Sequence, residues 1–340
     1  MSFENAMTTD EYDKLRADQM PWIEKYRPKR IDSIILPENL KNNAVQIVKT
    51  KNLPNLILTG PPGIGKTTSI RCIARELYGK HYKQCVIELN ASDDRGIKSA
   101  GDLYNFCRSV SFRKSSRNKD ESFCKYKLII MDEADNMLDK AQHQINKLME
   151  DYKDTVRFAF TCNSSADIIE AIQSRCIILR YMRLPVAQLG SRLTEICKIE
   201  KVNYEPDAIK QIAEMSRGDM RGAINILQLV HNKHNDIKLK YIESVCDMPQ
   251  PVSIKKIFNK CNTHDLKNAV KLTLALKHEG YSGSDITLGM IYTIKSELCL
   301  DIPEALKISM LEKICASAYN ISKAVDSNLQ LLSCLAELAA

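Results

Sequence analysis

The 340-residue sequence lacks the features that mark secreted and membrane-spanning proteins. It contains no run of about 18 apolar residues, the length that a membrane-spanning helix needs. Its first twenty residues are polar and acidic, without the basic start and apolar stretch of a signal peptide. We therefore expect a protein on the cytosolic or nuclear side of the cell, with no membrane among its partners.

No two of the twelve cysteines stand in the C-x-x-C arrangement that often holds zinc. In a reducing compartment such residues normally stay unpaired. Single cysteines lie among apolar residues at Cys72, Cys162, Cys197 and Cys246. These surroundings favour small hydrophobic core residues over metal ligands or nucleophiles.

The composition is that of a folded protein with a basic surplus. Apolar residues make up 44% and charged residues 27%, and the length suits two or three domains. The net charge of +7 permits a polyanionic partner without establishing one. Residues 108–127 carry seven basic and two acidic side chains. A solvated loop explains such a run more often than a binding site does.

The first half alternates short apolar runs with helix-length segments. This pattern predicts an α/β domain whose strands form a parallel sheet buried on both faces. The predicted strands are NLILT (55–59), CVIEL (85–89), KLIIMD (127–132), RFAFTC (157–162) and CIILRY (176–181).

After Leu184-Pro185 the strand signal stops, and apolar residues recur at three- and four-residue spacing. We expect three helices of a small second domain, within 187–202, 206–216 and 221–233. The two prolines of CDMPQP (246–251) indicate a further boundary. The rest is predicted to be helical, with a break around Gly280 and Gly283.

The strongest motif is GPPGIGKTT at 60–68, which matches the phosphate-binding loop pattern G-x-x-x-x-G-K-[ST]. It follows a predicted strand and opens a predicted helix, so backbone N–H groups and the helix N-terminus point at one anion. Lys66 is expected to reach the β and γ oxygens of a nucleotide, and Thr67 to hold a magnesium ion. The motif therefore predicts nucleotide binding.

The apolar strand KLIIMD ends in Asp132 and is followed by Glu133. A carboxylate at such a strand end can orient magnesium, and a second one can polarise an attacking water. We assign Asp132 to the metal and Glu133 to the water. Either carboxylate alone could be a charged strand end in solvent, but the pair after a phosphate loop favours ATP hydrolysis over mere binding.

Three further residues indicate a functional role only when they are taken together. Asn163 follows a strand and could hold either the attacking water or the γ-phosphate. Arg175 precedes the next strand, and Arg221 begins an amphipathic helix. Individually they could equally be a turn former, a surface charge and a salt-bridge partner.

One family carries the same segments in the same order: WIEKYRP (22–28), GPPGIGKTT, ELNASDDRGI (88–97), MDEAD, RFAFTCN, QSRC and GDMRGAIN. The chain after Met20 resembles the small subunits of replication factor C, the eukaryotic sliding-clamp loader of the AAA+ class. NASDDRGI, RFAFTCN and QSRCIILRY are most similar to the subunit 2 type. The resemblance implies a tail (1–20), an α/β AAA+ domain with a parallel sheet (21–183), a helical lid (184–247) and an all-α C-terminal collar (248–340).

The resemblance also implies site residues, with ATP and Mg²⁺ as cofactors. It places Ile23, Arg27 and Ile35 at the adenine. The residues around the phosphates are Gly60, Pro61, Pro62, Gly63, Ile64, Gly65, Lys66, Thr67 and Thr68. Asp132 and Glu133 form the Walker B pair, and Asn163 and Arg221 are sensors 1 and 2. Arg175 corresponds to an arginine finger that acts on the ATP of a neighbouring subunit.

Arg95, Ile97 and Lys147 correspond to positions that track one DNA strand through its backbone. The segment QINKLME keeps only Lys147 of two adjacent basic residues usual in the family. The implied partners are the other replication factor C subunits in a heteropentamer, the sliding clamp (proliferating cell nuclear antigen) and primer-template DNA. The implied place is the nucleus, in replication and repair.

Two other functions fit parts of the sequence. DEAD at 132–135 is also a helicase box, but such a helicase needs a second α/β motor domain, and the sequence after Leu184 has no apolar strand runs. A nucleotide-switched scaffold would bind ATP and rarely hydrolyse it. Glu133 and Asn163 argue against that, although low turnover is expected of a subunit alone when its finger comes from a neighbour.

Overall fold

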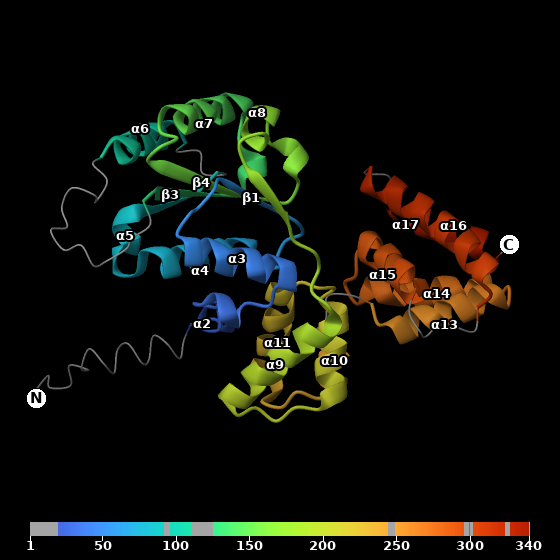
Figure 1. Cartoon of the computed structure of the whole chain (residues 1–340). Helices are drawn as coiled ribbons and strands as arrows, with labels where there is room; N and C mark the ends of the chain where they lie inside the picture. Colours follow the sequence, from blue (N-terminus) through green and yellow to red (C-terminus); the bar gives the residue numbers. More distant parts are fainter. Residues whose placement is uncertain are drawn as a thin grey trace, which may run out of the picture. The chain divides into compact units, whose positions relative to one another are not determined.

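The computed structural model describes residues 20–91, 96–109, 125–243, 249–295, 299, 302–323 and 327–339 (Figure 1). The chain divides into two compact units, Met1–Leu239 and Lys240–Ala340. Each unit has its own buried core.

A parallel five-stranded sheet forms the centre of the first unit, in the order β2-β3-β4-β1-β5. Leu56 of β1 lies opposite Ala159 of β4 on one side and Ile177 of β5 on the other, so β1 is an inner strand. All five predicted strands are confirmed, with ends that differ by at most one residue. They are β1 (Leu56–Thr59), β2 (Val86–Asn90), β3 (Lys127–Asp132), β4 (Val156–Cys162) and β5 (Ile177–Arg180).

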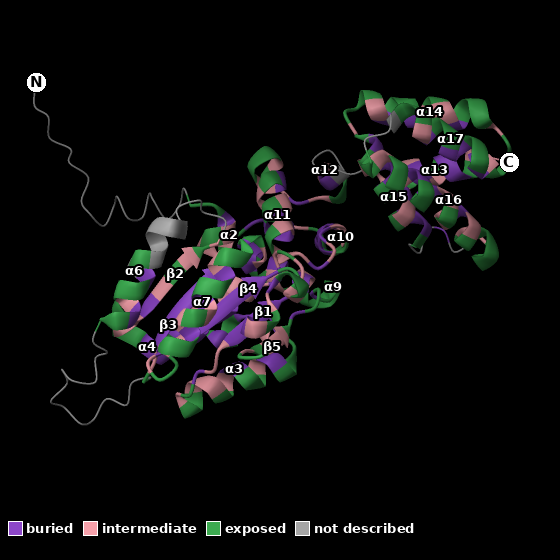
Figure 2. Ribbon diagram, turned by 90° about the horizontal axis from the view of Figure 1, so that it is seen from above, coloured by how far each residue is buried: buried purple, intermediate pink, exposed green. Residues whose placement is uncertain are grey.

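Helices cover both faces of this sheet, as Figure 1 shows, and the inner strands are buried (Figure 2). Alternate residues of β1 serve the two faces: Leu56 and Leu58 pack on the side of α3 and α4, and Ile57 packs on the side of α6 and α7. The α/β layering is therefore the predicted one. These helices are α3 (Glu38–Thr50), α4 (Lys66–Tyr78), α6 (Gly96–Arg108) and α7 (Asp139–Asp151).

Short helices form several connections in the first unit. They are α2 (Trp22–Lys25), η1 (Ile31–Ser33), η2 (Gly79–His81), α5 (Tyr82–Cys85), η4 (Ala134–Asn136), η5 (Ser165–Asp167) and α8 (Glu170–Gln173). The η4 turn places Asp135 directly beyond the end of β3.

Three helices after the sheet confirm the predicted small helical domain. They are α9 (Val186–Glu200), α10 (Pro206–Met215) and α11 (Met220–His234). Each buries an apolar stripe, for example Leu189 and Leu193 of α9 and Leu227 of α11. Asp219 caps α11, because its Oδ1 accepts hydrogen bonds from the backbone N–H groups of Arg221 and Gly222. A further helix, α12 (Leu239–Glu243), follows.

The described part of the second unit is helical, as predicted. Pro251 lies in the first turn of α13, where its missing N–H costs nothing. The predicted break near Gly280 and Gly283 is the turn between α14 and α15. The helices are α13 (Pro251–Asn262), α14 (Leu266–His278), α15 (Gly283–Lys295), α16 (Glu304–Ser322) and α17 (Ser327–Ala339).

The cysteine prediction holds where the structure describes the residue. Cys72, Cys162 and Cys197 are buried, and Cys246 lies outside the described residues. Burial raises the pKa of Cys72 and of Cys197 to about 11, so both thiols stay protonated at neutral pH. Among the described residues there is no cluster of three or more His, Cys, Asp or Glu side chains that could hold a metal, and no helix long and apolar enough to cross a membrane.

Lys127, counted above in the basic stretch 108–127, is buried at the start of β3. Its Nζ donates hydrogen bonds to the carbonyl oxygens of Phe106 at 2.7 Å and Ser109 at 2.6 Å, at the C-terminal end of α6. A cation there satisfies carbonyls that have no partner within the helix. Lys127 therefore ties α6 to the sheet, whereas Lys125 is exposed. Residues 110–124 lie outside the described residues.

Replacing Lys127 by methionine tests this cap. The variant keeps the apolar stem but removes the charged donor from the carbonyl oxygens of Phe106 and Ser109, so local opening of α6 should become easier by about 1–3 kcal/mol. Hydrogen exchange of the α6 amides measures this. Lys125→Met is the matched control and should change exchange by less than about 0.5 kcal/mol. Equal protection in both variants would contradict the capping role.

Candidate nucleotide-binding site

A cavity of about 550 Å³ lies at the carboxyl ends of the inner strands, between the sheet and the lid helices α9 and α11. Most of the residues predicted to bind nucleotide line it. They are Ile23, Arg27, Ile35, Pro62, Gly63, Ile64, Gly65, Lys66, Thr67, Thr68, Asp132, Glu133, Asn163 and Arg221. Gly60 and Pro61 do not line the cavity but contribute carbonyl oxygens to the Lys66 hydrogen bonds described next.

Lys66 opens helix α4 directly after the glycine-rich loop. Its Nζ lies 2.5 Å from the carbonyl oxygen of Gly60, 2.8 Å from that of Pro61 and 3.1 Å from Oδ1 of Asn163. Burial lowers the pKa of Lys66, and the nearby Asp132 and Asp135 carboxylates oppose that change. The side chain is half-buried at the N-terminus of a helix, where anions bind.

Thr67 and Asp132 meet across the cavity floor. The Thr67 hydroxyl donates to Oδ1 of Asp132 at 2.9 Å, and the hydroxyl of Thr161 on β4 donates to the same oxygen. A hydroxyl and a carboxylate side by side are hard oxygen donors of the kind that Mg²⁺ takes beside nucleotide phosphates. The residues present therefore fit the expected magnesium ion.

Glu133 stands at the turn where β3 ends. Its backbone has φ 54°, in the left-handed region, and its side chain is exposed at the cavity. For a residue other than glycine this conformation costs roughly 1–2 kcal/mol. Such strain gathers at functional sites, where the surrounding structure maintains it.

Asn163 follows β4 and is held by Asp135, a residue that sequence reasoning did not select. The backbone N–H and the side-chain Nδ2 of Asn163 both donate to Oδ2 of Asp135, at 3.1 and 3.0 Å. The amide oxygen of Asn163 accepts from Lys66. Asp135 was visible in the sequence as the last letter of DEAD, but strand patterns do not show which strand end it meets.

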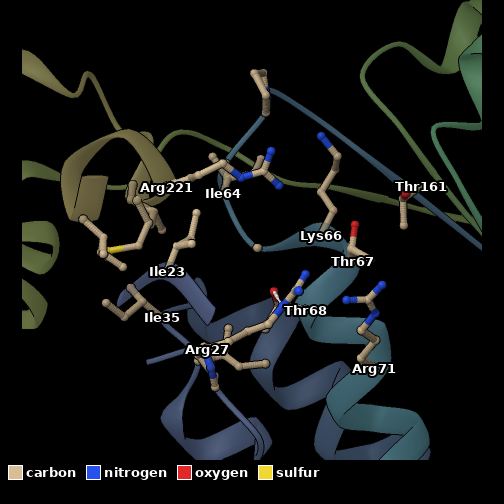
Figure 3. A pocket seen from close by; sticks show the side chains of 18 of the residues that line it. Ile23, Arg27, Ile35, Ile64, Lys66, Thr67, Thr68, Arg71, Thr161 and Arg221 are labelled. Carbon is tan, nitrogen blue, oxygen red and sulfur yellow. Dashed lines mark hydrogen bonds between the residues drawn. The ribbon is translucent and has the colours of Figure 1, made fainter. Parts of the chain in front are cut away.

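The lid touches the phosphate loop at Gly63. The backbone N–H of Met220 donates to the carbonyl oxygen of Gly63 at 3.2 Å. The Asp219 carboxylate lies so close that a Cβ on Gly63 would be 1.6 Å from its Oδ1. Gly63 also has φ 71°, which glycine adopts without strain. Arg221, one residue beyond Met220, extends into the cavity from the lid (Figure 3).

The segment before α3 forms the other end of the cavity. Figure 3 shows Ile23 and Ile35 on the side away from Lys66 and Thr67, which suits an apolar base. Arg27 Nε donates to Oγ1 of Thr68 at 3.3 Å.

The same segment is fixed to the lid helices. The backbone N–H of Trp22 donates to Oε1 of Gln228 on α11 at 2.9 Å. The indole ring of Trp22 stacks on the His231 ring, with the two centroids 5.2 Å apart. Glu200 of α9 accepts from Tyr26 at 2.5 Å and pairs with Lys25 at 2.7 Å. The base end of the cavity is therefore held from the lid.

Sequence reasoning also missed Arg71 and Arg192, which line the cavity. Arg71 of α4 pairs with Glu88 of β2 at 2.7 Å, and Arg192 of α9 donates to the carbonyl oxygen of Tyr26 at 2.9 Å. Arg71 follows Thr67 by four residues, so the helical period predicts that both lie on the same face of the helix. This spacing could have identified Arg71 from the sequence. Nothing local marked Arg192.

Arg175 does not belong to this cavity. It precedes β5, and its carbonyl oxygen accepts from Asn55, at the start of β1. The phosphate loop follows the other end of β1, and a four-residue strand spans about 13 Å. The guanidinium is exposed, paired with Glu150 and bonded to the carbonyl oxygen of Ala171. It therefore faces away from the chain's own phosphate loop.

The proposed DNA residues are described only in part. Lys147 is exposed on α7. Ile97 lies in the first turn of α6, but its side chain lies outside the described residues, as does Arg95 entirely.

Comparison with known proteins matches three domain families in the order of the fold. Residues 56–184 match the ATPase family associated with various cellular activities (AAA), residues 191–230 the RCF1/5-like AAA+ ATPase lid domain, and residues 249–337 the replication factor C C-terminal domain. The probable replication factor C subunit 2 of Dictyostelium discoideum is 40% identical over 94% of this chain and 92% of its own length. This chain belongs to the replication factor C small-subunit family. The resemblance read from its motifs is therefore confirmed, as is the succession of AAA domain, lid and helical C-terminal domain.

Further relatives refine the type. Replication factor C subunit 4 of Schizosaccharomyces pombe is 39% identical over 95% of this chain and 92% of its own length. Relatives named subunit 2 and relatives named subunit 4 thus match at similar identity, so the chain is of the subunit 2/4 type of this clamp-loader family of AAA+ ATPases.

Among solved structures, RuvB, the Holliday junction branch migration motor of Thermotoga maritima, matches with a TM-score of 0.53. It is 21% identical, and the match covers 69% of this chain and 78% of RuvB. At this identity the likeness concerns the fold alone.

Replacing Gly63 by alanine tests the contact between lid and phosphate loop. The new Cβ should displace the Asp219 carboxylate and with it the start of α11, so ATP affinity should fall about tenfold or more, a loss of at least about 1.4 kcal/mol. A titration with fluorescent ATP measures this. Gly79→Ala is the matched control, because Gly79 also has positive φ but no atom within 4 Å of a Cβ. Equal affinity in the two variants would argue against the contact.

Proposed function

We propose that this chain is an ATP-binding small subunit of the replication factor C clamp loader. In that complex it uses ATP binding and hydrolysis to help open the sliding clamp and load it onto primer-template DNA during replication and repair. The observation that carries the proposal is the cavity, in which Lys66, the Thr67–Asp132 pair, Glu133 and Asn163 converge. Its place is the nucleus.

Each part of the cavity has a role in this proposal. Ile23 and Ile35 contact the adenine, and Arg27 lies beside Thr68 at the phosphate loop. The backbone of residues 60–68 and Lys66 bind the phosphates. Thr67 and Asp132 hold the magnesium ion, which supplies charge neutralisation when bound. Arg221 brings a second cation from the lid to the phosphate end.

Hydrolysis follows from the placement of Glu133 and Asn163. Glu133 accepts a proton from a water whose oxygen attacks the γ-phosphorus. The bond from that phosphorus to the β–γ bridging oxygen breaks, and ADP leaves with the bonding electrons. Turnover by the chain alone is slow in this proposal, because Arg175, the arginine finger, faces away from this cavity.

Arg175 acts on a neighbouring subunit in this proposal. Its exposed guanidinium at the amino end of β5 is available to a second nucleotide site brought against that edge. Arg95, Ile97 and Lys147, in and around α6 and α7, follow the DNA backbone. The domain limits remain those proposed from the sequence: 1–20, 21–183, 184–247 and 248–340.

A helicase motor is less well supported. The described residues after Arg180 contain no further strand ladder, so they do not supply the second α/β domain that such a motor needs.

Two substitutions separate nucleotide binding from hydrolysis. Lys66→Ala removes a ground-state phosphate contact, so ATP affinity should fall about tenfold or more. Glu133→Gln keeps the shape but loses the base, so affinity should stay within about twofold while hydrolysis slows about 10² to 10⁴-fold. Equilibrium binding and single-turnover hydrolysis measure the two effects. Equal binding defects in both variants would contradict these roles.

Arg175→Ala should act on a different subunit's site. The ATP affinity of the chain that carries the substitution should stay within about twofold of the parent value. Hydrolysis at the adjacent subunit's site should slow by up to about 10³ to 10⁵-fold. The measurement is site-resolved hydrolysis in a complex where one subunit carries the change. Arg180→Ala, an exposed arginine at the other end of β5, is the control. Slowing confined to this chain's own site would overturn the assignment.

A further inference from the structure

Asp135 binds both the backbone and the side chain of Asn163 at the edge of the cavity. Its Oδ2 accepts from the backbone N–H and from Nδ2 of the same asparagine. The bond to Nδ2 restricts rotation of the Asn163 side chain, and the bond to the backbone N–H holds the carboxylate beside it. Bonds to a charged acceptor are about twice as strong as neutral ones. The amide of Asn163 is thus clamped although the residue is exposed.

The hydrogen bonds to Asp135 determine which end of the Asn163 amide points toward the nucleotide site. An asparagine amide has an acceptor end and a donor end, and rotating it by half a turn exchanges them. With Nδ2 bound to Asp135, Oδ1 is directed toward the Nζ of Lys66, 3.1 Å away. The amide therefore presents its acceptor oxygen, Oδ1, to the cavity, whereas its donor, Nδ2, is bound to Asp135.

An acceptor and a donor would do different chemistry here. A donor would bind a γ-phosphate oxygen, whereas an acceptor would be repelled by it and instead accept a proton from water. Sequence reasoning left both roles open for Asn163. The hydrogen bonds favour the water.

We propose that Asp135 is a positioning residue for hydrolysis: it holds the Asn163 amide with its oxygen toward the cavity, so that Asn163 orients the attacking water rather than binding the γ-phosphate. This inference rests on the proposed function, because it assumes hydrolysis at this site. Asn163 and Glu133 then each accept one proton of the same water, and its lone pair points at the γ-phosphorus.

Asp135 is also poorly suited to a purely structural role. Its other oxygen, Oδ1, is buried and accepts no hydrogen bond from the described residues. A buried acceptor without a donor costs free energy. The arrangement is therefore retained at a cost to stability, as is common where side chains are held for function.

The test compares four variants of the full-length chain, alone and assembled with the other replication factor C subunits of the same genome. Asp135→Ala releases the amide, and hydrolysis should slow about 100-fold through misplacement of the water, with ATP affinity unchanged within twofold. Asn163→Ala should cause a similar loss. The double variant should be no slower than Asn163→Ala, because the two residues act through one contact. Asp154→Ala, an exposed carboxylate at the far end of β4, should be without effect.

A conservative variant separates orientation from charge. Asp135→Asn retains an oxygen that can accept both Asn163 donors, so hydrolysis should fall by only about fivefold, since a neutral acceptor binds more weakly. If Asp135→Ala does not fold, Asp135→Ser is used, because its side chain is too short to reach Asn163. Additive losses in the double variant, or equal losses in Asp135→Asn and Asp135→Ala, would overturn the proposal.

A readout independent of turnover decides the orientation. The side-chain amide resonance of Asn163, assigned by its absence in Asn163→Ala, should exchange its protons with water faster in Asp135→Ala than in the parent chain. Unchanged exchange would contradict the clamp. If the parent complex shows no hydrolysis that depends on Glu133, the proposed function fails instead, and the amide exchange still tests the clamp.

Discussion

Parallel pairing of β3, β4 and β1 is the constraint on which the site depends. Parallel strands bring their carboxyl ends to one edge, so Asp132, Asn163 and the phosphate loop meet although Lys66 and Asn163 are 97 residues apart in the chain. The hydrogen bonds from Thr67 and Thr161 to Asp132 then join α4, β3 and β4 at one carboxylate. β5 pairs in parallel with β1, so Arg175, which precedes β5, lies toward the amino ends of the strands and away from this cavity.

The lid contributes to the cavity through backbone as much as through side chains. Met220 bonds to Gly63 at the phosphate end, and Glu200 and Gln228 hold the segment that carries Ile23 at the base end. Any movement of α9 and α11 therefore changes both ends of the nucleotide site together. This offers a physical route by which nucleotide binding at the cavity can alter the position of the lid, because both ends of a bound ATP would contact groups tied to these helices.

Much of this could be predicted from the sequence, for definite reasons. The five strands were recognisable because buried parallel strands are short, apolar and separated by helices, and the phosphate loop because its glycines and Lys66 stand at fixed spacing. Contacts between distant segments were not predictable in this way. The hydrogen bonds between Asp135 and Asn163 depend on how far the turn after β3 reaches toward β4. The contact of Asp219 with Gly63 depends on the angle at which the lid helices meet the phosphate loop. Lys127 was counted as part of a charged loop, and only the packing of α6 shows it to be buried.

In the proposed function, ATP turnover in this cavity serves clamp loading. The most direct measurement is ATP hydrolysis by the assembled complex with and without primer-template DNA and the sliding clamp. DNA and clamp together should stimulate hydrolysis beyond either alone, and the stimulation should require Glu133 of this chain. Hydrolysis that ignores the clamp, or that responds equally to DNA lacking a primer end, would contradict it.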